Sequence, residues 1–75
     1  MMAFIYVRKV KRRRIQTIIE FNGHMSSDEM KVLLKKLQKK LGTGGYIEDN
    51  KIVLRGDHRD RLQELLYDYG ISLTR

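Results

Sequence analysis

The chain contains no cysteine, and in a chain of only 75 residues this absence is the strongest constraint on the fold. It excludes a disulfide framework and a thiolate zinc site, which are common supports of very small domains. Side-chain packing alone must therefore hold the fold, and 41% hydrophobic residues are enough to build one small core. We expect one domain over residues 1–75, located in the cytoplasm.

Positive charge is concentrated in the first half of the chain. Residues 1–40 carry 11 basic and 3 acidic side chains, whereas residues 41–75 carry 5 basic and 6 acidic ones. This asymmetry predicts one basic side and a polyanionic partner, with nucleic acid ahead of an anionic membrane. The alternative is that the charge only keeps the protein soluble, and the charge count alone does not decide between the two.

Hydrophobic patterns with a period of two residues predict the strands. A β-branched and aromatic run at residues 4–7 and an alternating run at residues 15–21 read as two strands. Two further strands, at residues 46–48 and 51–54, flank the turn residues Asp49-Asn50. A short final strand is expected around Ile71 and Leu73.

Hydrophobic patterns with helical spacing predict two helices. The first begins at a capping box of Ser26 and Glu29 and ends at Gly42. The second begins at Asp57 and ends before Gly70. The order β-β-α-β-β-α-β predicts an α/β (α+β) two-layer sandwich, with both helices packed on one face of a mixed sheet. Both helical stripes are needed for the core, which leaves no apolar face for binding a membrane.

The strongest local signal is the basic block at residues 8–14, which we expect to form an exposed hairpin loop between the first two strands. One interpretation is a solvated hairpin whose charge discourages strand pairing. We favour contact with a polyanion, because neighbouring like charges repel unless an anion relieves them. The tyrosines are spread along the chain, so RNA phosphates and RNA shape are the expected targets rather than stacked bases.

The segment Gly42-Thr43-Gly44-Gly45 follows the first helix and has no P-loop spacing. A structural interpretation is a helix stop and a tight connection, which would need two of the three glycines. A functional interpretation is an exposed loop whose amides meet an RNA backbone beside Lys39 and Lys40. Both interpretations are compatible with the sequence.

Residues that could support catalysis are few. Asp57-His58 could form a hydrolytic pair, but neighbours at the start of a helix usually point in different directions. There is no nucleophile motif and no His, Asp or Glu cluster with metal-ligand spacing. We therefore expect no enzymatic activity, no bound metal and no cofactor.

Taken together, the motifs resemble translation initiation factor 1 of the eukaryotic and archaeal type, a domain that also occurs in stand-alone bacterial proteins. The resemblance rests on KKLQKKLGTGG at residues 35–45, LRGDHRD at residues 54–60 and the leucine-rich helix ending in Tyr69-Gly70-Ile71. It covers about residues 5–75. It implies a non-enzymatic factor that binds the small ribosomal subunit near the P site and promotes faithful selection of the start codon and initiator tRNA.

The resemblance also implies which residues meet the RNA. Hairpin contacts would come from Lys9, Lys11, Arg12, Arg13 and Arg14, and helix and loop contacts from Lys36, Lys39, Lys40, Thr43, Gly44 and Gly45. Structural turns and caps would come from Gly42, Gly56, Asp57 and Arg59.

The implied partners are small-subunit ribosomal RNA, indirectly initiator tRNA and mRNA, and other initiation factors, with the chain itself a monomer. Two departures stand out, because the family usually has Gln where this chain has Arg55 and its hairpin loop is commonly longer. The alternative function is a general RNA-binding or ribosome-associated module outside start-codon selection.

Overall fold

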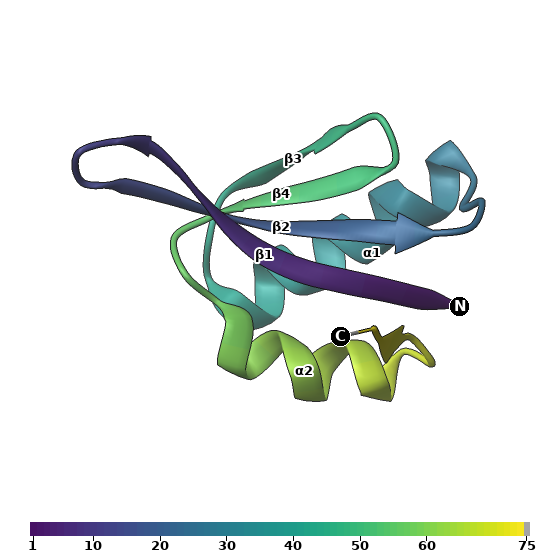
Figure 1. Cartoon of the computed structure of the whole chain (residues 1–75). Coiled ribbons are helices and arrows are strands. Elements are labelled where there is room, and N and C mark those ends of the chain that lie inside the picture. Colours follow the sequence, from purple (N-terminus) through teal and green to yellow (C-terminus); the bar gives the residue numbers. More distant parts are fainter. Residues whose placement is uncertain (75) are drawn as a thin grey trace.

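The computed structural model describes residues 1–74 and has the element order that the sequence predicts (Figure 1). The elements are β1 (Met2–Lys11), β2 (Arg14–Asn22), α1 (Ser27–Leu41), β3 (Gly45–Glu48), β4 (Lys51–Arg55), α2 (Arg59–Asp68) and β5 (Ser72–Leu73). No helix within this described part of the chain is long and apolar enough to cross a membrane.

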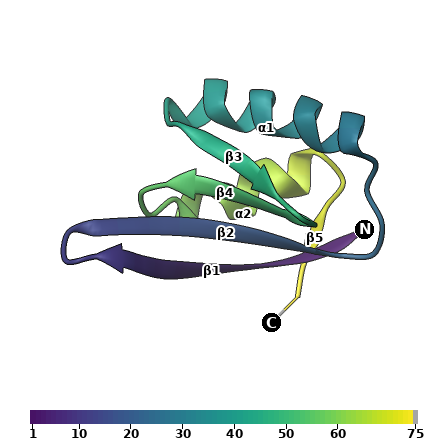
Figure 2. The same ribbon diagram turned by 90° about the horizontal axis from the view of Figure 1, so that it is seen from above.

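The five strands form one mixed sheet in the order β3-β4-β2-β1-β5. The neighbours are antiparallel except β1 and β5, which pair in parallel over two residues. Figure 2 shows α1 running along one side of this sheet. The predicted two-layer fold with a mixed sheet is confirmed.

The core lies between one face of the sheet and the two helices. From the strands it contains Ala3, Ile19, Phe21, Ile52 and Leu54, and from the helices Met30, Leu33, Leu37, Leu62 and Leu66. Both helices therefore cover the same face of the sheet. Burial of these side chains is the main favourable term in folding, because each fully buried aliphatic side chain contributes about 1.5–3 kcal/mol.

Helix α1 has the ends that the sequence predicts. The Ser26 hydroxyl accepts the backbone N–H of Glu29, whose carboxylate in turn accepts the backbone N–H of Ser26. At the other end Gly42 adopts the left-handed conformation with φ 63°, and its N–H donates to the carbonyl of Gln38. The helix thus begins and stops where local chemistry favours it.

Helix α2 begins differently from the prediction. The N-cap position is occupied by His58, whose side chain makes no capping hydrogen bond. Asp57 lies one residue earlier and accepts the backbone N–H of Arg59 at 3.2 Å. The carboxylate still satisfies a free donor of the first turn, but it does so from a turn that precedes the helix.

The basic hairpin has a shorter loop than the predicted residues 8–14. Strand β1 continues to Lys11 and β2 starts at Arg14, so only Arg12 and Arg13 form the turn. The register shifts between Lys9 and Lys11, which places a β-bulge at Val10. The prediction failed because dense charge forbids burial but does not forbid strand pairing. The two paired strands form a ribbon that projects beyond the rest of the sheet (Figures 1 and 2). The side chains of residues 8–15 in this ribbon are exposed.

The face of the sheet away from the helices is not wholly polar. Ile18 and Val53 are 0% and 1% exposed, yet they alternate with the core residues Ile19 and Ile52 and so point to the open face. Tyr6 pairs with Ile18 and Tyr46 pairs with Val53. The four side chains therefore form an apolar row across β1, β2, β4 and β3.

Candidate nucleic-acid interface

Three segments that are distant in sequence meet at the base of the basic hairpin. The backbone N–H of Arg55 donates to the carbonyl of Gly44 at 2.9 Å, and that of Gly56 donates to Ile15 at 2.8 Å. The Thr43 hydroxyl donates to the carbonyl of Arg55 at 2.8 Å. These bonds tie the glycine loop after α1 and the turn before α2 to the start of β2.

Thr17 fixes the turn before α2, a role that the sequence analysis missed. Its buried hydroxyl accepts the backbone N–H of His58 at 2.9 Å and donates to the carbonyl of Gly56. Gly56 itself has φ 91°, a backbone angle that residues other than glycine rarely adopt. In the sequence Thr17 looks like any inward position of an alternating strand, so no local signal marks this contact.

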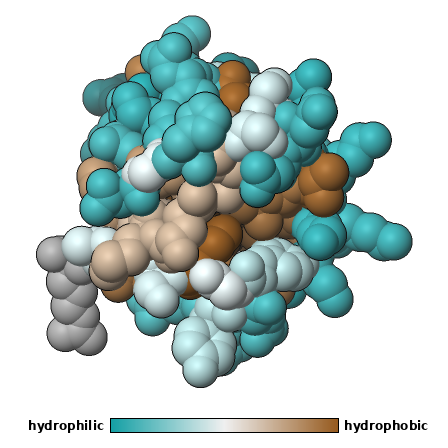
Figure 3. Space-filling view, turned by 90° about the vertical axis from the view of Figure 1, so that its right-hand side faces the viewer, coloured by the Kyte–Doolittle hydropathy of each residue, from teal (hydrophilic) through white to brown (hydrophobic). Residues whose placement is uncertain are grey.

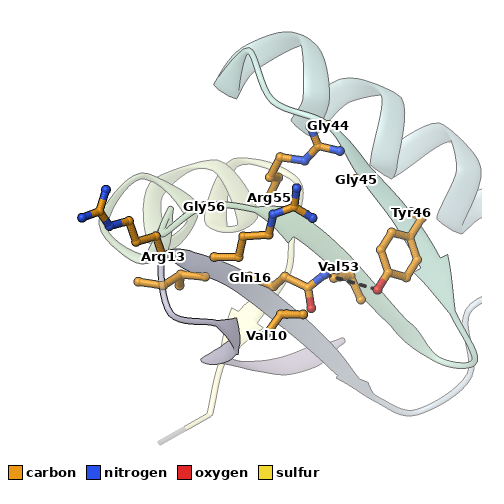
Figure 4. Close-up of a pocket in the computed structure, with 11 residues that line it drawn as sticks. Val10, Arg13, Gln16, Gly44, Gly45, Tyr46, Val53, Arg55 and Gly56 are labelled. Carbon is orange, nitrogen blue, oxygen red and sulfur yellow. Dashed lines mark hydrogen bonds between the residues drawn. The ribbon is translucent and has the colours of Figure 1, made fainter.

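A depression of about 450 Å³ lies between the hairpin and the glycine loop, on the open face of the sheet (Figure 4). Its walls include three arginines and no carboxylate among the residues described. They are formed by Val10, Arg13, Arg14, Ile15, Gln16, Gly44, Gly45, Tyr46, Val53, Arg55 and Gly56. The fold thus brings the hairpin and the glycine loop, two separately predicted parts of the site, into one surface.

Arg55 and Tyr46 are lining residues that the sequence analysis did not select. Tyr46 pairs with Val53 across β3 and β4, and Gln16 pairs with Arg55 across β2 and β4. Arg55 reaches toward Gly44, whereas Arg13 points away from the depression (Figure 4). The alternation along each strand indicates which of its side chains share a face. Only the register between the strands shows which side chains of different strands lie side by side.

Gly44 and Gly45, two of the glycines that line the depression, differ in what their positions require. A Cβ on Gly45 would lie 2.7 Å from the carbonyl oxygen of Val53 and 2.9 Å from a methyl of Leu54, so only glycine fits. A Cβ on Gly44 would make ordinary contacts of 3.9–4.0 Å with Arg55. Gly42 and Gly45 are thus needed by the fold, whereas neither space nor backbone conformation demands glycine at Gly44.

The lysines of α1 lie outside this depression. The Lys36 ammonium stands 5.3 Å from the centre of the Tyr69 ring, on the side of α1 that faces the end of α2. Arg61 donates to the backbone carbonyl of Lys40 at 3.1 Å, which links the last turn of α1 to α2. Lys36, Lys39 and Lys40 are exposed and belong to the helical layer, whereas Lys9, Lys11 and Arg12 extend along the hairpin.

The ion pairs of the described residues leave the hairpin cations other than Arg8 unneutralised. Within residues 1–74 the ion pairs are Arg8–Glu48, Lys51–Glu20 and Arg59–Asp57. In this part of the chain Lys9, Lys11, Arg12, Arg13 and Arg14 have no acidic partner within 4.0 Å. Their mutual repulsion is therefore relieved by external anions, either counterions or the phosphates of a bound polyanion.

Asp57 and His58 do not form a pair. The Asp57 carboxylate binds Arg59 at 2.8 and 3.0 Å, and these bonds hold the pKa of Asp57 below its usual value and raise the pKa of Arg59. The His58 Nε2–H donates to the carbonyl of Arg55 at 2.6 Å. In residues 1–74 no group of three or more His, Cys, Asp or Glu side chains is arranged to hold a metal ion.

Comparison with known proteins agrees with the motifs that this geometry assembles. Residues 3–72 match the family described as "Translation initiation factor SUI1". A "Protein translation factor SUI1 homolog" of Thermococcus gammatolerans is 38% identical over 68 residues, which are 91% of this chain and 68% of the relative. Proteins of the same description occur in Sulfurisphaera tokodaii, at 40% identity over 89% of this chain and 68% of the relative, and in Ignicoccus hospitalis, at 41% over 88% and 62%. The chain therefore belongs to the translation initiation factor SUI1 family.

Proposed function

We propose that this chain binds the small ribosomal subunit near the P site and promotes faithful pairing of start codon and initiator tRNA. Membership of a translation initiation factor family supports the process. The observation that carries the contact is the projecting hairpin, whose cations beyond Arg8 have no internal acidic partner in residues 1–74. Neutralising RNA phosphates releases counterions, which is the main source of sequence-independent affinity for nucleic acid.

The proposed mechanism combines electrostatic docking with steric discrimination. The hairpin binds ribosomal RNA together with Lys36, Lys39 and Lys40 of α1, and Thr43, Gly44 and Gly45 approach its backbone. The two-stranded ribbon projects beyond the sheet and can occupy volume that a correctly paired codon–anticodon helix takes over. Initiator tRNA and mRNA are thus indirect partners of a monomeric cytoplasmic factor, which acts without a cofactor and without catalysis.

Binding of labelled protein to purified small subunits across a salt series tests the docking step. Lys11→Ala/Arg12→Ala removes two hairpin cations that do not line the depression. We expect weaker binding and a salt slope that is flatter by about 0.7 log units per lost phosphate contact, the value for single-stranded RNA. Lys31→Ala/Lys35→Ala, on α1, removes the same charge elsewhere and should change binding much less.

An unchanged slope in the hairpin variant would remove the hairpin from the interface. If the protein binds a bare structured RNA as tightly as the subunit, the basic surface is generic and the alternative of a general RNA-binding module is correct. Toeprinting then tests the fidelity step, because only the proposed role predicts that added protein lowers initiation at near-cognate codons.

A further inference from the structure

The depression at the base of the hairpin contains an aromatic ring that phosphate binding alone does not explain. Tyr46 is 46% exposed, and its hydroxyl accepts a hydrogen bond from Gln16 Nε2 at 3.4 Å. Gln16 lies on β2 and Tyr46 on β3, so the tyrosine reaches across the intervening strand β4. Arg8 in turn donates to Gln16 Oε1 at 2.8 and 3.1 Å. This chain of bonds connects the ring to Gln16 and Arg8 on the open face.

The surroundings of this ring are cationic and partly apolar. Val53, the strand partner of Tyr46, is buried beside it, and Arg14 and Arg55 line the same depression. No carboxylate lines it in the part of the chain described. Its volume of about 450 Å³ falls in the usual range for small-ligand sites, about 300–1,000 Å³.

This combination matches the chemistry of a nucleotide. The base offers a flat π-face that stacks on an aromatic side chain or on an arginine plane. The phosphate offers an anion that arginine binds through two parallel hydrogen bonds. An acidic peptide would use the arginines but would leave the half-exposed tyrosine ring without a matching partner.

We propose that the depression binds one unpaired RNA nucleotide, with its base stacked on Tyr46 and its phosphate held by Arg14 and Arg55. This inference rests on the proposed function, because it places an unpaired nucleotide of the bound RNA beside the docked hairpin. It adds base contact to a surface for which the sequence indicated contact with RNA phosphates and RNA shape rather than with stacked bases. It also gives Arg55 a specific task.

The test uses the full chain and fluorescently labelled single-stranded RNA hexamers. Tyr46→Leu keeps an apolar strand residue but removes the ring, and Tyr46→Phe keeps the ring but removes the hydroxyl. Tyr67→Leu removes a tyrosine that is 78% exposed on α2 and does not line the depression, and it serves as the matched control. Circular dichroism and urea unfolding establish that each variant is folded.

We expect Tyr46→Leu to weaken hexamer binding by about five- to tenfold, the lower end of the range for one base stacked on an aromatic side chain. Tyr46→Phe and Tyr67→Leu should bind within about twofold of the unaltered chain. An abasic hexamer with the same phosphates should bind the unaltered chain and Tyr46→Leu equally and weakly. The amides of Gly44, Gly45 and Arg55 should shift in NMR spectra when the base-bearing hexamer is added.

Two results would overturn the inference. One is equal binding of the base-bearing and abasic hexamers to the unaltered chain, and the other is an unchanged affinity of Tyr46→Leu. Neither result touches the proposed function, which fails instead if Lys11→Ala/Arg12→Ala leaves the salt dependence of subunit binding unchanged. An acidic peptide that competes with the hexamer and loses affinity in Tyr46→Leu would likewise count against a nucleotide as the ligand.

Discussion

The two ends of this molecule are built from the same few elements but present opposite chemistry. At the hairpin end the depression is lined by three arginines and no described carboxylate. At the opposite end, which Figure 3 faces, hydrophobic atoms lie between polar ones. The residues that line the hollows there include Met1, Met25 and Val32, the carboxylates Asp28, Glu29 and Asp49, and one cation, Lys36.

The direction in which α1 runs contributes to this difference in charge between the two ends. Helix α1 begins with Asp28 and Glu29 and ends with Lys39 and Lys40, so its charges complement its own dipole at both ends. The end of α1 is linked to α2 by the bond from Arg61 to Lys40, and Gly56, in the turn before α2, is bonded to Ile15 of β2. A charge order that stabilises one helix thus also contributes to a charge difference along the whole domain.

Reversing charges should give the largest difference in binding affinity between variants of the two regions. Arg12→Glu/Arg13→Glu places carboxylates where phosphates are expected, and juxtaposed like charges cost several kcal/mol. We expect binding to the small subunit to fall by about 100-fold, whereas Lys31→Glu/Lys35→Glu, with the same change in net charge, should alter it far less. Equal losses in the two variants, measured at one salt concentration, would mean that net charge rather than the hairpin end governs docking.

The two neighbouring glycines at the hairpin end sharpen the comparison between fold and function. Gly45→Ala should lower the free energy of unfolding by about 1–3 kcal/mol, because its Cβ would collide with the backbone of β4. Gly44→Ala should stay within about 0.5 kcal/mol of the unaltered chain. Urea unfolding midpoints measure both, and a large loss in Gly44→Ala would show that this glycine is structural after all.

The smallest effect is expected at the ion pair of the turn before α2. Because the pKa of Asp57 is lowered in the folded state, its carboxylate adds stability above its unfolded pKa, and this stability is lost as the pH falls through the folded pKa. Asp57→Asn should therefore lower the thermal midpoint slightly at pH 7 and not at pH 2. A difference of equal size at both pH values would assign the effect to the lost turn geometry instead of the charge.

The sequence predicted those parts of the molecule whose signals are local. The capping box at Ser26 and Glu29, the stop at Gly42 and the leucine spacing of α1 all act within one element, and each appears in the structure as expected. The fold class follows from the order of the predicted strands and helices.

The parts that the sequence did not predict depend on pairing between distant strands. Charge density showed that residues 8–14 are exposed, but the length of the ribbon depends on how β1 pairs with β2. Tyr46 and Arg55 come together only through the register of β3, β4 and β2. Thr17 gains its role from a turn that lies about 40 residues further along the chain.

The narrow ribbon also determines how the molecule moves. Pairing of β2 with β4 ends at Gln16 and Arg55, so the last part of the hairpin is a two-stranded ladder without a third strand. A two-stranded ladder is marginally stable in water, and its backbone fluctuates more than the sheet behind it. Immobilising such a segment on a rigid RNA surface costs conformational entropy, which lowers the net affinity of every contact it makes. In the proposed role this entropy cost is useful, because it weakens the hold of a ribbon whose volume a correctly paired codon–anticodon helix takes over.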